Sequence, residues 1–154
     1  MAIPRTTAQF KRQSPMTPLD RITERASRLG HPDAPGTPRP LLTVKEFFEG
    51  TVEIGSIGCN LDGAPEPDAF HAVCSAIARR PDVEDIRVQI TAFDVSEWPF
   101  SDTAYIMTSA TPEEVETWFP EHLKPDETWT GFLDQAYEPY QVPSGTRPVA
   151  CWWD

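Results

Sequence analysis

The stretch Asp85-Ile86-Arg87-Val88-Gln89-Ile90-Thr91 alternates β-branched apolar residues with polar ones. This period of two is typical of a strand with one buried face. A second apolar stretch, Thr103-Ala104-Tyr105-Ile106-Met107-Thr108, follows a loop that contains Trp98-Pro99-Phe100-Ser101-Asp102. The two stretches predict a hairpin with a long loop at the centre of one sheet.

The sequence around this hairpin predicts further helices and strands. Thr43 and Glu46 form a capping box before a short helix that Gly50 ends. Apolar residues at helical spacing predict a helix over 68–80, and Thr111 followed by Pro112 predicts the start of another that ends near Phe119. Strands are expected at 54–61, where glycines allow a bulge, and at 149–153, whereas 124–147 is expected to be irregular.

From residue 54 onward the expected order is strand, helix, strand, strand, helix, strand. This order predicts an α+β fold, a ferredoxin-like split βαβ plait with a four-stranded antiparallel sheet in the order 4-1-3-2. Ile86, Val88 and Ile90 then face the helices. The opposite face carries Arg87, Gln89 and Thr91 with one of Tyr105/Ile106 and one of Trp152/Trp153, so we expect the N-terminal helix or a partner to cover it.

The first 40 residues differ from the rest of the chain. Thr17, Pro18 and Asp20 predict the start of an amphipathic helix over 17–29, and four prolines follow within residues 31–40. We expect residues 1–16 to be disordered in the absence of a partner. The predicted organisation is a basic, proline-rich arm (1–40) and an acidic α+β domain (41–154).

The charge of the chain is strongly negative. The net charge is −11, and residues 41–154 carry six basic and 21 acidic side chains, a net charge of −15. Such a body repels nucleic acid and anionic lipid and attracts basic protein surfaces. The alternative is that the acidity serves only solubility. Three widely spaced cysteines, no apolar run of membrane-spanning length and no signal-like N-terminus predict a cytoplasmic protein with reduced thiols.

Motifs for catalysis are weak. Cys59, in the glycine-rich stretch 55–60, and His71 suggest a thiol–imidazole nucleophile, but a small cysteine on a strand is more typical of a core. The same glycines lack the lysine of a P-loop and the third glycine of a dinucleotide fingerprint. His31, His71 and His122 lack the spacing of a metal site, so no metal and no cofactor is expected.

Two groups of residues are candidates for binding a partner. The first is the densest acidic run and the tryptophan that follows it: Glu113, Glu114, Glu116, Glu121, Asp126, Glu127 and Trp129. It is either a solvated surface or a contact for a basic partner with the tryptophan as an anchor. The second group is Trp98, Phe100 and Asp102 in the hairpin loop, where the aromatics either enter the core or serve recognition.

Three stretches occur together in this chain: residues 42–50, Gly55-Ser56-Ile57-Gly58-Cys59-Asn60, and Trp152-Trp153-Asp154. Through them, residues 41–154 resemble small acidic bacterial proteins of uncharacterised function. It implies no activity and no functional residues. Small acidic α+β proteins are often immunity proteins that neutralise toxins, which is an analogy of size and charge.

Three functions follow as expectations. The leading one is a non-catalytic protein-binding protein, most specifically an immunity or inhibitor-type protein that neutralises a basic toxin or enzyme. The first alternative is an accessory subunit that docks onto a larger complex through its N-terminal arm. The second is an enzyme that uses Cys59. The expected partner is another protein with a basic surface, and the residues leave the oligomeric state open.

Overall fold

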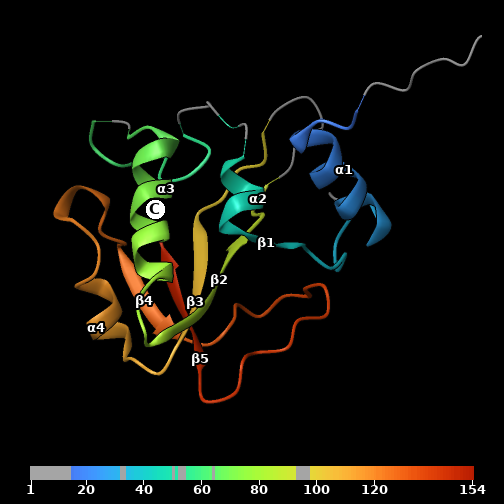
Figure 1. Ribbon diagram of the computed structural model, residues 1–154. Helices are drawn as coiled ribbons and strands as arrows, with labels where there is room; N and C mark the ends of the chain where they lie inside the picture. Colours follow the sequence, from blue (N-terminus) through green and yellow to red (C-terminus); the bar gives the residue numbers. More distant parts are fainter. Residues whose placement is uncertain (1–14, 32–33, 50, 52–54, 64, 93–97) are drawn as a thin grey trace, which may run out of the picture.

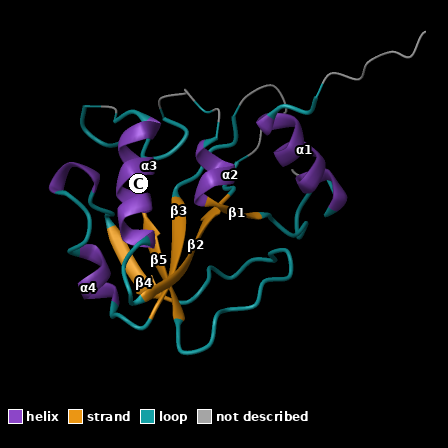
Figure 2. Cartoon of the chain, in the orientation of Figure 1, coloured by secondary structure: helices purple, strands orange, loops and turns teal. Residues whose placement is uncertain are grey.

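The computed structural model describes residues 15–31, 34–49, 51, 55–63, 65–92 and 98–154. Helices and strands alternate irregularly along the chain (Figure 2). The helices are α1 (Pro18–Arg28), α2 (Val44–Phe48), α3 (Pro67–Ala78), α4 (Pro112–Glu116) and the 3-10 helix η1 (Glu121–Leu123). The strands are β1 (Leu41–Thr43), β2 (Val83–Gln89), β3 (Thr103–Thr108), β4 (Glu127–Thr130) and β5 (Arg147–Trp152).

The five strands form one antiparallel sheet in the order β1-β2-β3-β5-β4. The predicted hairpin is confirmed, because β2 and β3 pair directly at the centre with Ile86 opposite Ile106 and Val88 opposite Ala104. β4 lies at the end of the sheet farthest from α1 (Figure 1). The fold is therefore α+β, as expected.

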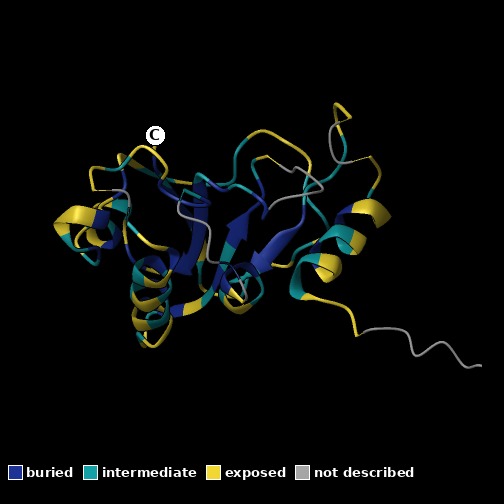
Figure 3. Ribbon diagram, turned by 90° about the horizontal axis from the view of Figure 1, so that it is seen from above, coloured by how far each residue is buried: buried dark blue, intermediate teal, exposed yellow. Residues whose placement is uncertain are grey.

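The main core lies between the sheet and the helices α2, α3 and α4. Ile86, Val88 and Ile90 belong to it, as the alternation predicts, together with Phe70 and Trp153, whose rings meet edge to face at 5.5 Å. Burial is concentrated in the strands, while the outer faces of the helices are exposed (Figure 3). Burial of these large side chains is the main source of stability.

The four-stranded ferredoxin-like plait is not confirmed, since the sheet has five strands and a different order. The strand expected at 54–61 is one reason. Residues 52–54 lie outside the described residues, and residues 55–61 form turns in which Ile57 makes a single bridge to Ser101. Gly55 and Gly58 have φ values of +90° and +65°, which end an extended conformation. β5 therefore pairs directly with β3.

Two strands lie where the sequence predicts none. β1 is three residues long and pairs with the end of β2, and β4 is four residues long and pairs with β5 inside the segment expected to be irregular. The helix expected from Thr111 to about Phe119 is shorter than predicted. Thr111 caps α4 as expected, but the α-helix ends at Glu116.

The second face of the sheet is covered by the chain itself. Residues 131–146 run across it, so that the rings of Phe132 and Tyr137 contact Tyr105 and the ring of Tyr140 contacts Phe132. The expectation that the N-terminal helix or a partner covers this face is therefore wrong for most of it. Of the two pairs of alternatives for this face, Tyr105 and Trp152 lie on it, while Ile106 and Trp153 belong to the main core.

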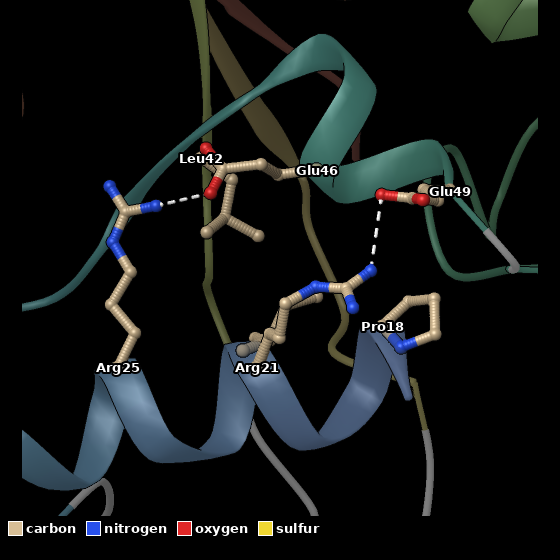
Figure 4. A pocket seen from close by; sticks show the side chains of 7 residues that line it. Pro18, Arg21, Arg25, Leu42, Glu46 and Glu49 are labelled. Carbon is tan, nitrogen blue, oxygen red and sulfur yellow. Dashed lines mark hydrogen bonds and ion pairs between the residues drawn. The ribbon is translucent and has the colours of Figure 1, made fainter. Parts of the chain in front are cut away.

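Helix α1 docks beside α2 and β1 through buried apolar residues and through two arginines, Arg21 and Arg25. The predicted capping box of Thr17 and Asp20 is present, and Ile22 and Ala26 are buried. Arg25 donates to Glu46 Oε2 at 2.7 Å, to Leu41 O at 3.2 Å and, through two nitrogens, to both carboxylate oxygens of Glu138. Figure 4 shows the seam between α1 and the segment 42–49, where Arg21 also pairs with Glu49 at 3.4 Å. The seam encloses about 40 Å³, which is room for water only.

Glu46 makes this seam sensitive to acid. Partial burial raises the pKa of its carboxyl, but hydrogen bonds from the Thr43 N–H and from Arg25 outweigh burial and hold the pKa below its ordinary 4.5. A pKa lowered by folding gives stability that is present above the unfolded pKa and is lost as the pH falls through the folded one. Because the side chain is 40% exposed, we take the contribution as about 0.5–1 kcal/mol.

We therefore expect the melting temperature to fall more steeply for the wild type than for Glu46→Gln between about pH 5 and about pH 3. Thermal unfolding followed by circular dichroism measures this. Glu24→Gln is the control, because Glu24 pairs with Arg28 on the open surface of α1. Parallel curves for the wild type and Glu46→Gln would contradict the prediction.

Candidate functional site

A groove of about 360 Å³ opens on the second face of the sheet where residues 131–146 leave it uncovered. We call it the β4 groove. It lies where β2 and β5 end and β3 and β4 begin. Glu127, Trp152 and Thr103 are neighbours across three strands there. The lining side chains are Gln89, Thr91, Asp102, Thr103, Glu127, Trp129, Leu133, Gln135 and Trp152.

A buried polar network lies under the groove. The hydroxyls of Tyr105 and Tyr137 are 2.6 Å apart, and they lie 2.8 and 2.5 Å from Gln89 Oε1. Gln135 donates to Tyr137 at 3.0 Å. Burial raises the pKa of both tyrosines, so both keep their protons at neutral pH. The network fixes the side chain of Gln89 and hence the floor of the groove.

The network extends to the carboxylate of Asp102. Gln89 Nε2 donates to Thr91 Oγ1 at 3.2 Å, and the Thr91 hydroxyl donates to Asp102 Oδ1 at 2.6 Å. The Thr103 hydroxyl donates to the same oxygen at 2.8 Å. Among the described residues nothing donates to Asp102 Oδ2. Asp102 therefore presents an oriented carboxylate with one oxygen available to a ligand.

Two tryptophans and a second carboxylate complete the groove. Trp129 and Trp152 are half-buried, whereas Glu127 is exposed at the start of β4. None of the ion pairs among the described residues involves Asp102 or Glu127, and the described residues that line the groove include no Lys or Arg. Carboxylates beside indole rings attract cations, both by charge and through the ring faces.

The structure divides the predicted acidic run between the groove and the helical side of the sheet. Glu127 and Trp129 line the groove. Glu113, Glu116 and Glu121 line a separate hollow of about 420 Å³ between α4 and η1, where Glu116 pairs with Lys124 at 3.3 Å. Glu114 is exposed on α4, and Asp126 is exposed and accepts from the backbone N–H of Asp154 at 2.8 Å.

The acids of both sites surround one edge of the sheet. α4 packs against β4, and the hydroxyl of Thr128 donates to the Pro112 carbonyl at 3.3 Å. We use the name acidic edge for Glu113, Glu116, Glu121, Asp126 and Glu127. Charges on both faces of an edge strand add to one field that a basic protein meets.

The three candidates in the hairpin loop, Trp98, Phe100 and Asp102, also lie in different places. Asp102 lines the groove, but Trp98 is 9% exposed and belongs to the main core. Phe100 is half-buried, and its backbone pairs with Ala92 and Thr91. Of the two roles expected for this aromatic residue, packing in the core and recognition of a partner, Trp98 has the first.

Cys59 and His71 lie in different surroundings. Cys59 is exposed, so it is not the core residue that its sequence context suggests, while His71 stacks on Phe48 with ring centroids 5.1 Å apart. Cys74 and Cys151 are buried, and burial raises the pKa of the Cys74 thiol to about 12. The described residues contain no group of three or more His, Cys, Asp and Glu side chains that could hold a metal ion.

Sequence reasoning placed Gln89 and Thr91 on this face but did not select Trp152 or Gln135 as site residues. The available signal was the alternation Glu127-Thr128-Trp129-Thr130, which puts the acid and the tryptophan on one face of a strand. Pairing that strand with 147–152 would have added Trp152.

In the parts of the chain that the structure describes, no helix has the length and apolar character needed to cross a membrane.

Comparisons with known proteins agree on one family. The model described as "Uncharacterized protein YfbO family" matches residues 17–151. The "Uncharacterized protein YfbO" of Escherichia coli (strain K12) is 43% identical over 140 residues, which make up 90% of this chain and 100% of that protein. No solved structure matches. The expected resemblance to uncharacterised bacterial proteins is confirmed, and the match also includes α1.

Proposed function

The chain belongs to the YfbO family. From the acids gathered around β4, we propose that it is a non-catalytic protein-binding protein. Its most specific form is an immunity or inhibitor-type protein that neutralises a basic toxin or enzyme. The observation that carries the proposal is the acidic edge beside the β4 groove. Such a surface attracts a basic protein and offers tryptophans as anchors for it.

The groove supports binding more than catalysis. The hydroxyls of Thr91 and Thr103 both donate to Asp102, and the lining residues that the structure describes include neither a histidine nor a cysteine. A nucleophile needs an adjacent base that takes its proton. The carboxylate of Asp102 is instead arranged as an acceptor for a donor that a partner brings.

The packing of α1 favours this proposal over an accessory subunit that docks through its arm. Ile22 and Ala26 are only 3% and 4% exposed, so the apolar side of α1 is already used within the chain. Removing residues 1–14, which leaves α1 in place, should then preserve partner affinity.

The cytoplasmic location remains part of the proposal and is consistent with three free cysteines.

The proposal is tested with the partner captured by the purified protein from a lysate of the source cell at low salt, identified, and then purified. We expect the triple variant Glu113→Gln, Glu116→Gln, Glu121→Gln to associate with it about tenfold more slowly, because three attractive charges are lost. The difference should shrink at high salt. Stopped-flow association kinetics measure both effects.

The matched control removes the same charge elsewhere. Asp62, Glu66 and Glu84 are exposed and line neither the β4 groove nor the hollow between α4 and η1, so Asp62→Asn, Glu66→Gln, Glu84→Gln should change the association rate by less than about twofold. Equal slowing by both triple variants would reduce the proposal to a general effect of net charge. Failure to capture any partner at low salt would reject it, and Cys59→Ser should behave as the wild type.

A further inference from the structure

We infer that the β4 groove recognises an arginine side chain of the basic partner. The inference rests on the proposed function, since it names the group through which that partner is held. Two carboxylates and two indole rings converge on one groove of about 360 Å³, and no Lys or Arg is among the described residues that line it. This is the chemistry that receives a guanidinium group.

The first step of the argument is the state of Asp102. Its Oδ1 already accepts from two hydroxyls, at 2.6 and 2.8 Å, so the carboxylate is held before any ligand arrives. Its Oδ2 has no donor among the described residues. A fixed carboxylate with one available oxygen forms a charge-assisted hydrogen bond without reorganising, which strengthens binding.

The second step is the position of the aromatic rings. Trp152 is paired across the sheet with Glu127 on one side and Thr103 on the other, and Trp129 lies two residue pairs further along. The indoles are therefore interleaved with the acids on one face. A planar guanidinium can stack on an indole while its N–H groups reach carboxylates, whereas a lysine ammonium is a compact, strongly hydrated charge.

The third step is that the arginines near the groove, Arg39 and Arg87, bind other groups and not the groove carboxylates. Arg39 is near, but it donates to the backbone carbonyls of Ile90 and Thr91 at 3.2 and 2.8 Å. Arg87 is bound to Asp85 at 2.8 Å beneath Tyr140. Within the described residues the groove thus keeps two carboxylates without an ion pair, on a body of net charge −15.

The test titrates the ¹⁵N-labelled full chain with N-acetyl-arginine methylamide, whose ends are uncharged. We expect the indole N–H signals of Trp129 and Trp152 and the amide of Asp102 to shift with a Kd of about 1 mM, a usual strength for one side chain. The lysine analogue should bind at least about threefold more weakly. The citrulline analogue, which has the same shape without the charge, should cause no shift.

Variants locate the site. Asp102→Asn keeps acceptors for Thr91 and Thr103 and should weaken binding of the arginine derivative about tenfold, the loss of one charge-assisted hydrogen bond. Asp126→Asn, exposed and outside the groove lining, should leave it unchanged. Equal binding of the lysine and arginine derivatives, or equal effects of the two variants, would overturn the inference.

The partner assay separates this inference from the proposed function. If Asp102→Asn weakens the partner and the arginine derivative alike, the inference is supported. If the triple variant of the acidic edge slows association but Asp102→Asn changes neither ligand, the proposed function survives and the arginine site is rejected. If no partner is captured but the arginine derivative binds as expected, the proposed function fails and the groove remains a guanidinium site.

Discussion

Replacing Gly58 with alanine is expected to lower the free energy of unfolding by about 3 kcal/mol. Gly58 has a φ of +65°, which costs an L-residue about 1–2 kcal/mol. A Cβ at this position would also lie 2.5 Å from Cζ of Phe70 and 3.0 Å from Leu61. Phe70 is fully buried against Trp153, so it cannot move without disturbing the core.

The control for this variant is Gly63→Ala. Gly63 has a φ of +80°, but nothing lies within 4 Å of the added methyl group, so only the backbone cost applies. Denaturant unfolding of both variants separates the two effects. We expect Gly63→Ala to cost about 1 kcal/mol, and the remaining 2 kcal/mol of Gly58→Ala to come from the clash with Phe70. Equal losses would show that the contact with Phe70 relaxes freely.

Replacing Arg25 with methionine is expected to cost about 2–3 kcal/mol and to lower the melting temperature by about 4–10 °C. The change removes hydrogen bonds to Glu138, Glu46 and the Leu41 carbonyl. Glu138 is only 17% exposed and would keep its charge without a cation. Methionine retains much of the apolar stem, so the loss reports on the guanidinium group.

Two further variants show the origin of that loss. Arg28→Met, on the same helix, breaks a pair with Glu24 whose side chains are 73% and 44% exposed, and should cost less than about 0.5 kcal/mol. Adding Glu138→Gln to Arg25→Met should restore about 1 kcal/mol, because the stranded carboxylate disappears. The prediction would fail if Arg25→Met and Arg28→Met unfolded at the same temperature.

Local signals in the sequence were sufficient for the central hairpin and for the helix starts. The alternation over 85–91 depends on one buried face, and the capping boxes at Thr17 and Thr43 close hydrogen bonds within four residues. Such features need no distant partner. The sequence therefore predicts them without knowledge of the rest of the fold.

Features that depend on distant partners were missed or wrong. β1 and β4 are too short to show a period and become strands only because β2 and β5 pair with them. The stretch 54–61 has apolar residues typical of a strand, but Gly55 and Gly58 turn it. The cover over the second face comes from aromatic residues in 131–146, whose irregular spacing gives no local signal.

The candidate site shows the same division. Asp102, Glu127 and Trp129 were selected from charge and residue type, and the structure places all three in the β4 groove. Trp152 was missed as a site residue because its neighbours belong to β3 and β4, about 50 and 25 residues earlier in the chain, and such separations leave no sequence pattern.

The position of β5 between β3 and β4 has a consequence for the order of folding. β4 precedes β5 in the chain, yet among the described strands it pairs only with β5, so it cannot join the sheet until the later strand has docked on β3. The chain between β3 and β5 must therefore close into a loop before β4 can pair with β5. The side of the β4 groove that carries Glu127 and Trp129 is therefore among the last parts to assemble. A folding intermediate that has only the central hairpin would lack it.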